Sequence, residues 1–188
     1  MGAFLNRYGL IVVKLKKDAS LEEIVKRLQL KLVIEDQVLL IDAVQEDEYR
    51  IGKFNDILII CTEEIFHFFL ETFDNLPKKL MSSLSKEKMS AVYYYSVSGI
   101  DGYSYFEKGK RIRTYYIVDD KLLVNIGDEL DVEKEEFRQK LRESADYPFV
   151  DDVQGSIIQK TTDIELNVLL NMEIKMTKFE IMNTNRIK

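Results

Sequence analysis

Acid–base chemistry in this chain would centre on His67, which is its only histidine. Imidazole changes charge near neutral pH, so a histidine that a carboxylate orients can act as a general base. If the segment around it is helical, Glu63 and Glu71 lie four residues before and after His67 on the same helical face. These three residues are the candidate catalytic group of a small hydrolase-type enzyme. The alternative is a helical histidine paired with a carboxylate beside a phenylalanine-rich core.

The sequence lacks the other familiar catalytic signatures. One histidine and one cysteine cannot supply a multi-histidine metal site or a structural zinc cluster. The only cysteine, Cys61, follows an apolar run, which predicts a buried structural thiol. The segment from Gly99 to Gly102 joins two expected strands, whereas a phosphate-binding loop joins a strand to a helix. We therefore expect no metal and no cofactor, and the sequence favours a protein that is not an enzyme.

Carboxylates concentrate in the second half of the chain. From Asp119 to Asp152 there are twelve acidic and five basic residues, a net charge of −7, in a chain whose net charge is −6. Asp128, Glu129 and Glu133 lie in this segment, near the expected start of a helix. Such residues usually form a solvated face. The alternative is a surface that binds a basic protein partner, and the acidic balance argues against nucleic acid.

Tyrosines are concentrated as well, with seven of the ten between positions 93 and 116. Tyr93 and Tyr95 share one face of an expected strand, and Tyr103 and Tyr105 share one face of the next. Aromatic side chains fill pleated surfaces, so packing within the sheet is one interpretation. A recognition surface, or the pocket of a small-ligand sensor, is the alternative.

Apolar patterning and turn residues predict the elements that position these side chains. Gly99 with Gly102, Gly109 and Asp119-Asp120 mark turns that divide residues 89–126 into a four-stranded antiparallel meander. Other strands are expected at 8–15, 37–44, 56–61 and 172–182. Helices are expected from Ser20, from Thr62, near 76–84 and near 131–143, and helix is favoured over 155–171. Ser20 and Glu23 have the spacing of a capping box.

Strands mixed with separate helices, without strict alternation, predict an α+β fold with a mainly antiparallel sheet and several packed helices. No linker composition interrupts the chain, so residues 1–188 are expected to form a single domain. No apolar run approaches the roughly 20 residues that span a bilayer. The single cysteine favours the reducing cytoplasm. The oligomeric state is left open.

One stretch resembles a known kind of domain. Residues 102–113 (GYSYFEKGKRIR) and 126–133 (IGDELDVE) resemble an element of uncharacterised bacterial α+β domains, some of which are similar to immunity or accessory proteins of toxin systems. The resemblance carries over no catalytic residue. Within it, Arg113 can pair with Glu129 or Glu133 and tie the meander to the following helix. Our leading hypothesis is an interaction protein of this kind, with a basic protein as its partner.

Overall fold

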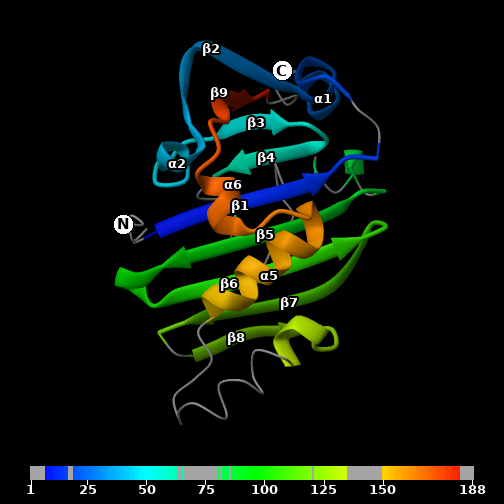
Figure 1. Ribbon diagram of the computed structural model, residues 1–188, viewed down its shortest axis with the longest axis vertical. Helices are drawn as coiled ribbons and strands as arrows, with labels where there is room; N and C mark the ends of the chain where they lie inside the picture. The colour runs from blue at the N-terminus through cyan, green and yellow to red at the C-terminus, as the bar shows by residue number, and fades with distance from the viewer. Residues whose placement is uncertain are drawn as a thin grey trace, which may run out of the picture.

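Nine strands form one antiparallel sheet in the part of the chain that the computed structural model describes, namely residues 7–16, 19–62, 65, 80, 82–84, 86–119, 121–134 and 150–182. The strand order is β2-β9-β3-β4-β1-β5-β6-β7-β8, so β2 and β8 form the two edges (Figure 1). The strands are β1 (Arg7–Lys14), β2 (Leu30–Leu39), β3 (Arg50–Phe54), β4 (Ile57–Cys61), β5 (Lys88–Tyr95), β6 (Ile100–Glu107), β7 (Lys110–Val118), β8 (Lys121–Ile126) and β9 (Lys175–Ile181).

The described helices are short and lie against the sheet. They are α1 (Leu21–Leu28), α2 (Leu40–Ala43), the 3-10 turn η2 (Ser96–Ser98), α5 (Val150–Thr162) and α6 (Leu166–Leu170). A further helix begins at residues 131–134. Figure 1 shows α5 and α6 crossing one face of the sheet, over β1, β5 and β6.

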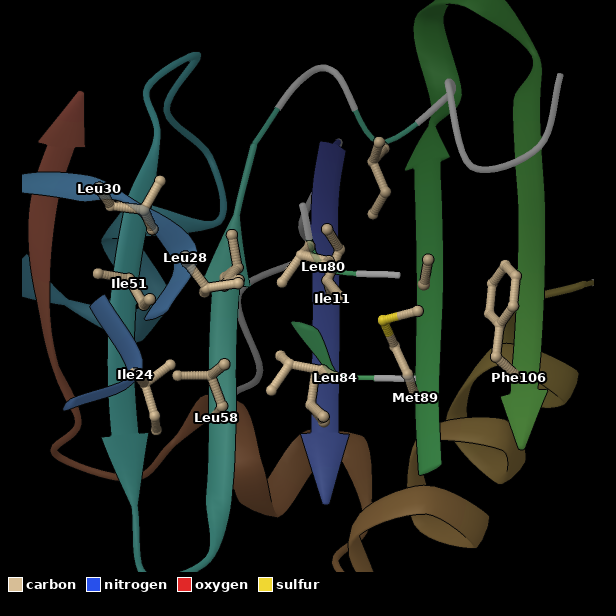
Figure 2. Packing of buried hydrophobic residues seen from close by; sticks show 14 of the residues in the cluster. Ile11, Ile24, Leu28, Leu30, Ile51, Leu58, Leu80, Leu84, Met89 and Phe106 are labelled. Carbon is tan, nitrogen blue, oxygen red and sulfur yellow. The ribbon is translucent and has the colours of Figure 1, made fainter. Parts of the chain in front are cut away.

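The centre of the sheet is buried on both faces. β1 pairs with β4 on one side and with β5 on the other, and every residue of β4 is buried. On one face, Ile24 and Leu28 of α1 lie over β3 and β4 (Figure 2). On the opposite face, Ile157 and Ile158 of α5 belong to a second apolar cluster. Strands covered on both sides need continuous apolar sequence, which is why the middle of β1 (residues 10–13) and all of β4 are apolar.

A buried glutamine fixes α5 on the sheet. Gln154 accepts a hydrogen bond from the Tyr8 hydroxyl at 2.8 Å and donates one to the carbonyl oxygen of Tyr93 at 3.0 Å. It also donates to the carboxylate of Asp101. These bonds satisfy polar groups from β1, β5 and β6, so the helix is held in register over three strands.

The prediction of an α+β fold is wrong, because the nine-stranded sheet makes this a mainly-β protein with a few short helices. β3 was not predicted from the sequence, and the strand predicted at 37–44 is misplaced, because β2 runs from Leu30 to Leu39 and α2 follows it. Ile34, Glu35 and Asp36 form a bulge between Val33 and Gln37, and this irregularity breaks the alternation that identifies a strand. β3 is short and carries Arg50, Gly52 and Lys53, so it also lacks a strand pattern.

Other predicted elements are confirmed. The meander is present as β5 to β8, with β7 and β8 at their expected bounds. Lys108 and Gly109 both have positive φ, as a tight hairpin turn requires. Ser20 and Glu23 make both hydrogen bonds of the capping box that begins α1. Most of the helix expected from Thr62, and of those expected near 76–84 and 131–143, lies outside the described residues.

Two glycines give opposite predictions for substitution by alanine. A Cβ on Gly155 would meet no atom within 4 Å, whereas one on Gly102 would lie 2.6 Å from Cδ2 of Tyr116. In the interior of α5, Gly155→Ala is expected to raise the free energy of unfolding by about 0.5–1 kcal/mol, since alanine loses less backbone entropy on folding. Gly102→Ala is expected to lower it by about 1–3 kcal/mol through overpacking. Urea denaturation measures both, and a destabilising Gly155→Ala would contradict this account of α5.

Candidate functional site

The four candidate tyrosines do not meet in one place. Tyr93 belongs to the apolar cluster on the α1 face and Tyr95 packs against that cluster, whereas Tyr103 and Tyr105 belong to the cluster on the α5 face. The register explains the separation, because Tyr93 pairs with Gly102 and Tyr103 pairs with Val92. The four residues therefore cannot line one shared pocket.

Most of these rings are part of the core. Tyr93, Tyr103 and Tyr105 are each less than a tenth exposed. The ring of Tyr93 lies over Gly9, where a Cβ would come within 3.2 Å of it. Burial raises the pKa of Tyr105, and so does its neighbour Glu107. An aromatic ring that covers a glycine in the adjacent strand is a packing device, so these contacts support the sheet-packing interpretation.

Arg113 forms the ion pair with Glu133 that the sequence suggested. Its guanidinium is 2.8 Å from Glu133 Oε1 through Nη2, and its Nε donates to both carboxylate oxygens at 2.9 and 3.1 Å. Nη1 donates to Asn125 Oδ1 and to the carbonyl oxygens of Ile126 and Gly127. Each of the three guanidinium nitrogens thus has an acceptor, which is the condition under which a buried charge is tolerated.

Glu133 connects the cation to the next helix. Its carboxylate accepts a hydrogen bond from the Tyr103 hydroxyl at 2.5 Å and another from the backbone N–H of Leu130 at 2.6 Å. The second bond is half of a capping box, because Glu133 is the third residue after Leu130. Gly127, at φ +82°, makes the close turn into this helix, since a Cβ there would overlap the carbonyl oxygen of Ile112. The network therefore fixes the path of residues 126–134.

The protonation states of the network follow from its geometry. Burial alone would lower the pKa of Arg113, but its hydrogen bonds to Glu133 and the charges around it raise that pKa. Burial and the adjacent Glu133 carboxylate both raise the pKa of the Tyr103 hydroxyl. Arg113 is a cation and Tyr103 a neutral donor, so neither group supplies a proton acceptor. The network therefore has a structural role. We call it the Arg113 clamp, and it consists of Arg113, Glu133, Tyr103 and Asn125.

Carboxylates next to the clamp point outward. Asp128 and Glu129 are exposed, and neither has an ion-pair partner within the described ranges. Asp131 has a 98% exposed side chain and lies 3.5 Å from Lys134. The clamp uses the carboxylate of Glu133 and leaves those of Asp128 and Glu129 uncompensated. Four of the predicted binding residues are charged, namely Arg113, Asp128, Glu129 and Glu133. Of these, only Asp128 and Glu129 present unpaired charge to solvent.

A second charged cluster, which was not predicted from the sequence, surrounds Arg50 on β3. This arginine is 3% exposed and pairs with Asp36, Glu46 and Glu48 at 3.0, 2.5 and 3.0 Å. Burial would lower the pKa of Arg50, but Glu46 and Asp36 raise it. Lys178 lies 2.5 Å from Glu48. A basic residue inside a strand, close to a run of three acidic residues, is the sequence signal that could have indicated this cluster.

A concavity of about 450 Å³ lies beside the Arg50 cluster, between the segment before β3 and strand β9. Its acidic side chains are already paired: Asp47 with Arg7, Glu48 with Lys178, and Glu180 with Lys31. The remaining lining is mixed, and the full lining set is Asp47, Glu48, Tyr49, Lys178, Phe179, Glu180 and Ile181. Because its charges are satisfied internally, this concavity offers no free charge to a ligand.

The remaining chemistry-bearing residues are either buried or outside the described part. His67, Glu63 and Glu71 lie outside the described residues. Cys61 is buried, and burial raises the pKa of its thiol. Within the described ranges no group of three or more histidine, cysteine, aspartate or glutamate residues is placed to hold a metal ion. None of the helices in those ranges combines the length and apolar character that crossing a bilayer requires.

Comparison with known proteins gives a family but no activity. A family model described as a family of unknown function, DUF6928, matches residues 18–149. No curated protein and no solved structure matches the chain. The matched range contains the clamp, Arg50 with its three carboxylates, and both edge strands of the sheet.

Removing the charge of Glu133 tests the clamp. Glu133→Gln leaves Arg113 buried without a counter-charge, so the free energy of unfolding is expected to fall by about 3 kcal/mol in urea denaturation. The matched control is Glu129→Gln, an exposed carboxylate four residues away, which is expected to change it by less than about 0.5 kcal/mol. Equal losses in the two variants would show that the clamp does not stabilise this turn.

Cys61 is expected to resist thiol reagents in the folded protein. Its thiol is 1% exposed and its raised pKa keeps it protonated, whereas the thiolate is the reactive form. Labelling with 5,5′-dithiobis-(2-nitrobenzoate) at pH 8 should be complete within minutes in denaturant, and slower by more than about a hundredfold without it. Rapid labelling of the native chain would contradict the burial of β4.

Proposed function

The chain belongs to DUF6928, a family of unknown function, and we propose that it is a non-enzymatic protein that binds a basic protein partner through an acidic surface. The surface consists of Asp128, Glu129 and Asp131, which follow β8. The observation that carries the proposal is that Asp128 and Glu129 are exposed without a cation partner in the described part of the chain.

The carboxylates around Arg50 differ from Asp128 and Glu129 in having a cation partner. There, Asp36, Glu46 and Glu48 surround one buried arginine, so their charges stabilise the fold. Beside the Arg113 clamp only Glu133 is used in this way. Asp131 lies 3.5 Å from Lys134 on the surface, and Asp128 and Glu129 remain free. Uncompensated like charges repel each other and do not help folding. A basic partner would remove this repulsion.

The clamp supports the proposal in a second way. Because Glu133 and Gly127 fix the path of residues 126–134, the free carboxylates sit on an ordered turn rather than on a loose tail. Charges on an ordered element lose less conformational entropy when they bind. Charge complementarity would mainly speed association and orient the partner, so the complex should weaken as salt is added.

The proposal includes a cellular role and location. We infer an immunity-like or accessory role, in which the protein neutralises a basic partner. The acidic surface lies in the segment whose sequence resembles proteins of that kind. We place it in the cytoplasm, because the only cysteine is a buried free thiol that needs no oxidising compartment.

Charge reversal tests the acidic surface. A fluorescent peptide of about eight residues, with valines in its middle and two lysines at each end, serves as a defined basic probe, matched to the length of a common strand. Asp128→Lys/Glu129→Lys is expected to weaken its binding by at least about tenfold in fluorescence anisotropy at low salt. The same double substitution is expected to abolish partner recovery when the protein is used as bait in a native lysate.

The control variant carries the same change in charge elsewhere. Glu35→Lys/Glu173→Lys alters two exposed carboxylates far from β8 in the sequence, and binding should stay within about twofold of wild type. If both variants weaken binding equally, only the net charge matters and the proposed surface is wrong. Absence of binding by the wild-type protein at low and moderate salt would also refute the proposal.

A further inference from the structure

The sheet has two edges, and they differ in how they are protected. A strand at an edge presents unpaired backbone N–H and C=O groups, and proteins usually block such edges with bulges, charges or proline. β2 is blocked in this way. Ile34, Glu35 and Asp36 bulge out between Val33 and Gln37, and both the carboxylate and the carbonyl oxygen of Asp36 are bound by Arg50.

β8 lacks most of this protection. It pairs only with β7 among the described strands. From Leu122 to Ile126 it contains neither a charged residue nor a proline. Leu123 is the extra residue of a bulge opposite Tyr116 and Ile117, and it leaves two consecutive leucines outside the core. Leu122 is 49% exposed and Leu123 is 55% exposed.

Acidic residues lie at both ends of β8. Asp119 lies before β8, and Asp128 and Glu129 lie after it, all exposed to solvent. Lys121 is the one cation on the strand itself. An edge with an apolar middle and acidic ends is complementary to an extended segment with apolar residues in its middle and basic residues at its ends.

We propose that β8 is the docking edge for the basic partner, and that an extended segment of that partner adds to the sheet as a tenth strand. The inference rests on the proposed function, because the free carboxylates select a basic partner. To the proposed function, the inference adds how the partner is recognised, namely by backbone pairing with β8. Main-chain hydrogen bonds to β8 would supply affinity, and the side chains of Leu122 and Leu123 would contact the apolar residues of the added strand.

The test uses the full chain and the lysine–valine peptide described above. Hydrogen exchange is followed residue by residue by NMR, with and without saturating peptide. Strand addition is expected to slow exchange of alternate amides between Leu122 and Ile126 by at least about tenfold, because only alternate N–H groups point to the added strand. Amides of β2 should not change, so the blocked edge serves as an internal control.

Uncharged substitutions separate edge contact from electrostatics. Leu122→Gln/Leu123→Gln keeps the net charge and is expected to weaken peptide binding by about tenfold. Its control is Ile34→Gln/Val168→Gln, which removes two other exposed apolar side chains, 70% and 47% exposed, and should change binding by less than about twofold. Should the leucine variant fail to fold, the exchange experiment on the wild-type chain still decides.

The outcomes distinguish the two proposals. Peptide binding that depends on Asp128 and Glu129 but protects no amide of β8 would overturn strand addition and leave the acidic surface intact. No peptide binding at low salt would overturn the acidic surface, and strand addition with it. Protection of β8 together with loss of binding in the leucine variant supports both.

Discussion

The whole structure depends on the burial of β1 between β4 and β5. This strand joins two antiparallel units, one formed by β2, β9, β3 and β4 and the other by the meander from β5 to β8. Leu10, Ile11, Val12 and Val13 have no exposed surface, and alternate members face opposite clusters. A strand with apolar side chains on both faces must have cover on both faces. On one face of the sheet Leu80 and Leu84 lie over β1 (Figure 2), and on the other face α5 packs against it.

Each half of the sheet then contains one buried arginine near its edge. Arg50 holds the bulge of β2, and Arg113 holds the turn that follows β8. The two sites use the same chemistry, a guanidinium enclosed by carboxylates and carbonyl oxygens, which is tolerated in a core only when its donors are satisfied. The two sites differ in whether all the neighbouring carboxylates have a cation partner. The carboxylates around Arg50 are used by it and by Lys178, whereas Asp128 and Glu129, close to Glu133 in the sequence, are not paired with any described residue.

Local sequence signals predicted the meander and the start of α1 well. Lys108-Gly109 and Asp119-Asp120 separate β6, β7 and β8 by short turns, and short-range turn chemistry sets the register of a hairpin. β2 was misplaced because its partner β9 is distant in the sequence, whereas β3 was missed because Arg50, Gly52 and Lys53 leave it without a strand pattern. β9, near the end of the chain, lies between them, and the bulge at Ile34–Asp36 interrupts the pattern that a single strand would show. Pairing over such separations leaves no local signature.

The tyrosines show where prediction of a site from sequence stops. Tyr93 and Tyr95 share a face because side chains alternate between the two faces of a strand. Tyr103 and Tyr105 share a face for the same reason. Whether both pairs share the same face depends on the connection between β5 and β6. Tyr95 pairs with Ile100, so odd-numbered residues of β5 face even-numbered residues of β6. A connection one residue longer or shorter would have placed all four rings together. The register therefore excludes a ligand pocket that all four rings would line together.

The residues that match the family model form only part of the sheet. Residues 18–149 include both edge strands and both buried arginines, but not β1 or β9. Without β1, β4 and β5 would have no common neighbour, and without β9, β2 would not be joined to β3. In this chain the matched range therefore supplies the edges of the sheet, while segments on either side of that range supply two of its interior strands. The surface proposed for binding lies in the matched range. The sheet that supports this surface also needs β1 and β9, which lie outside the matched range.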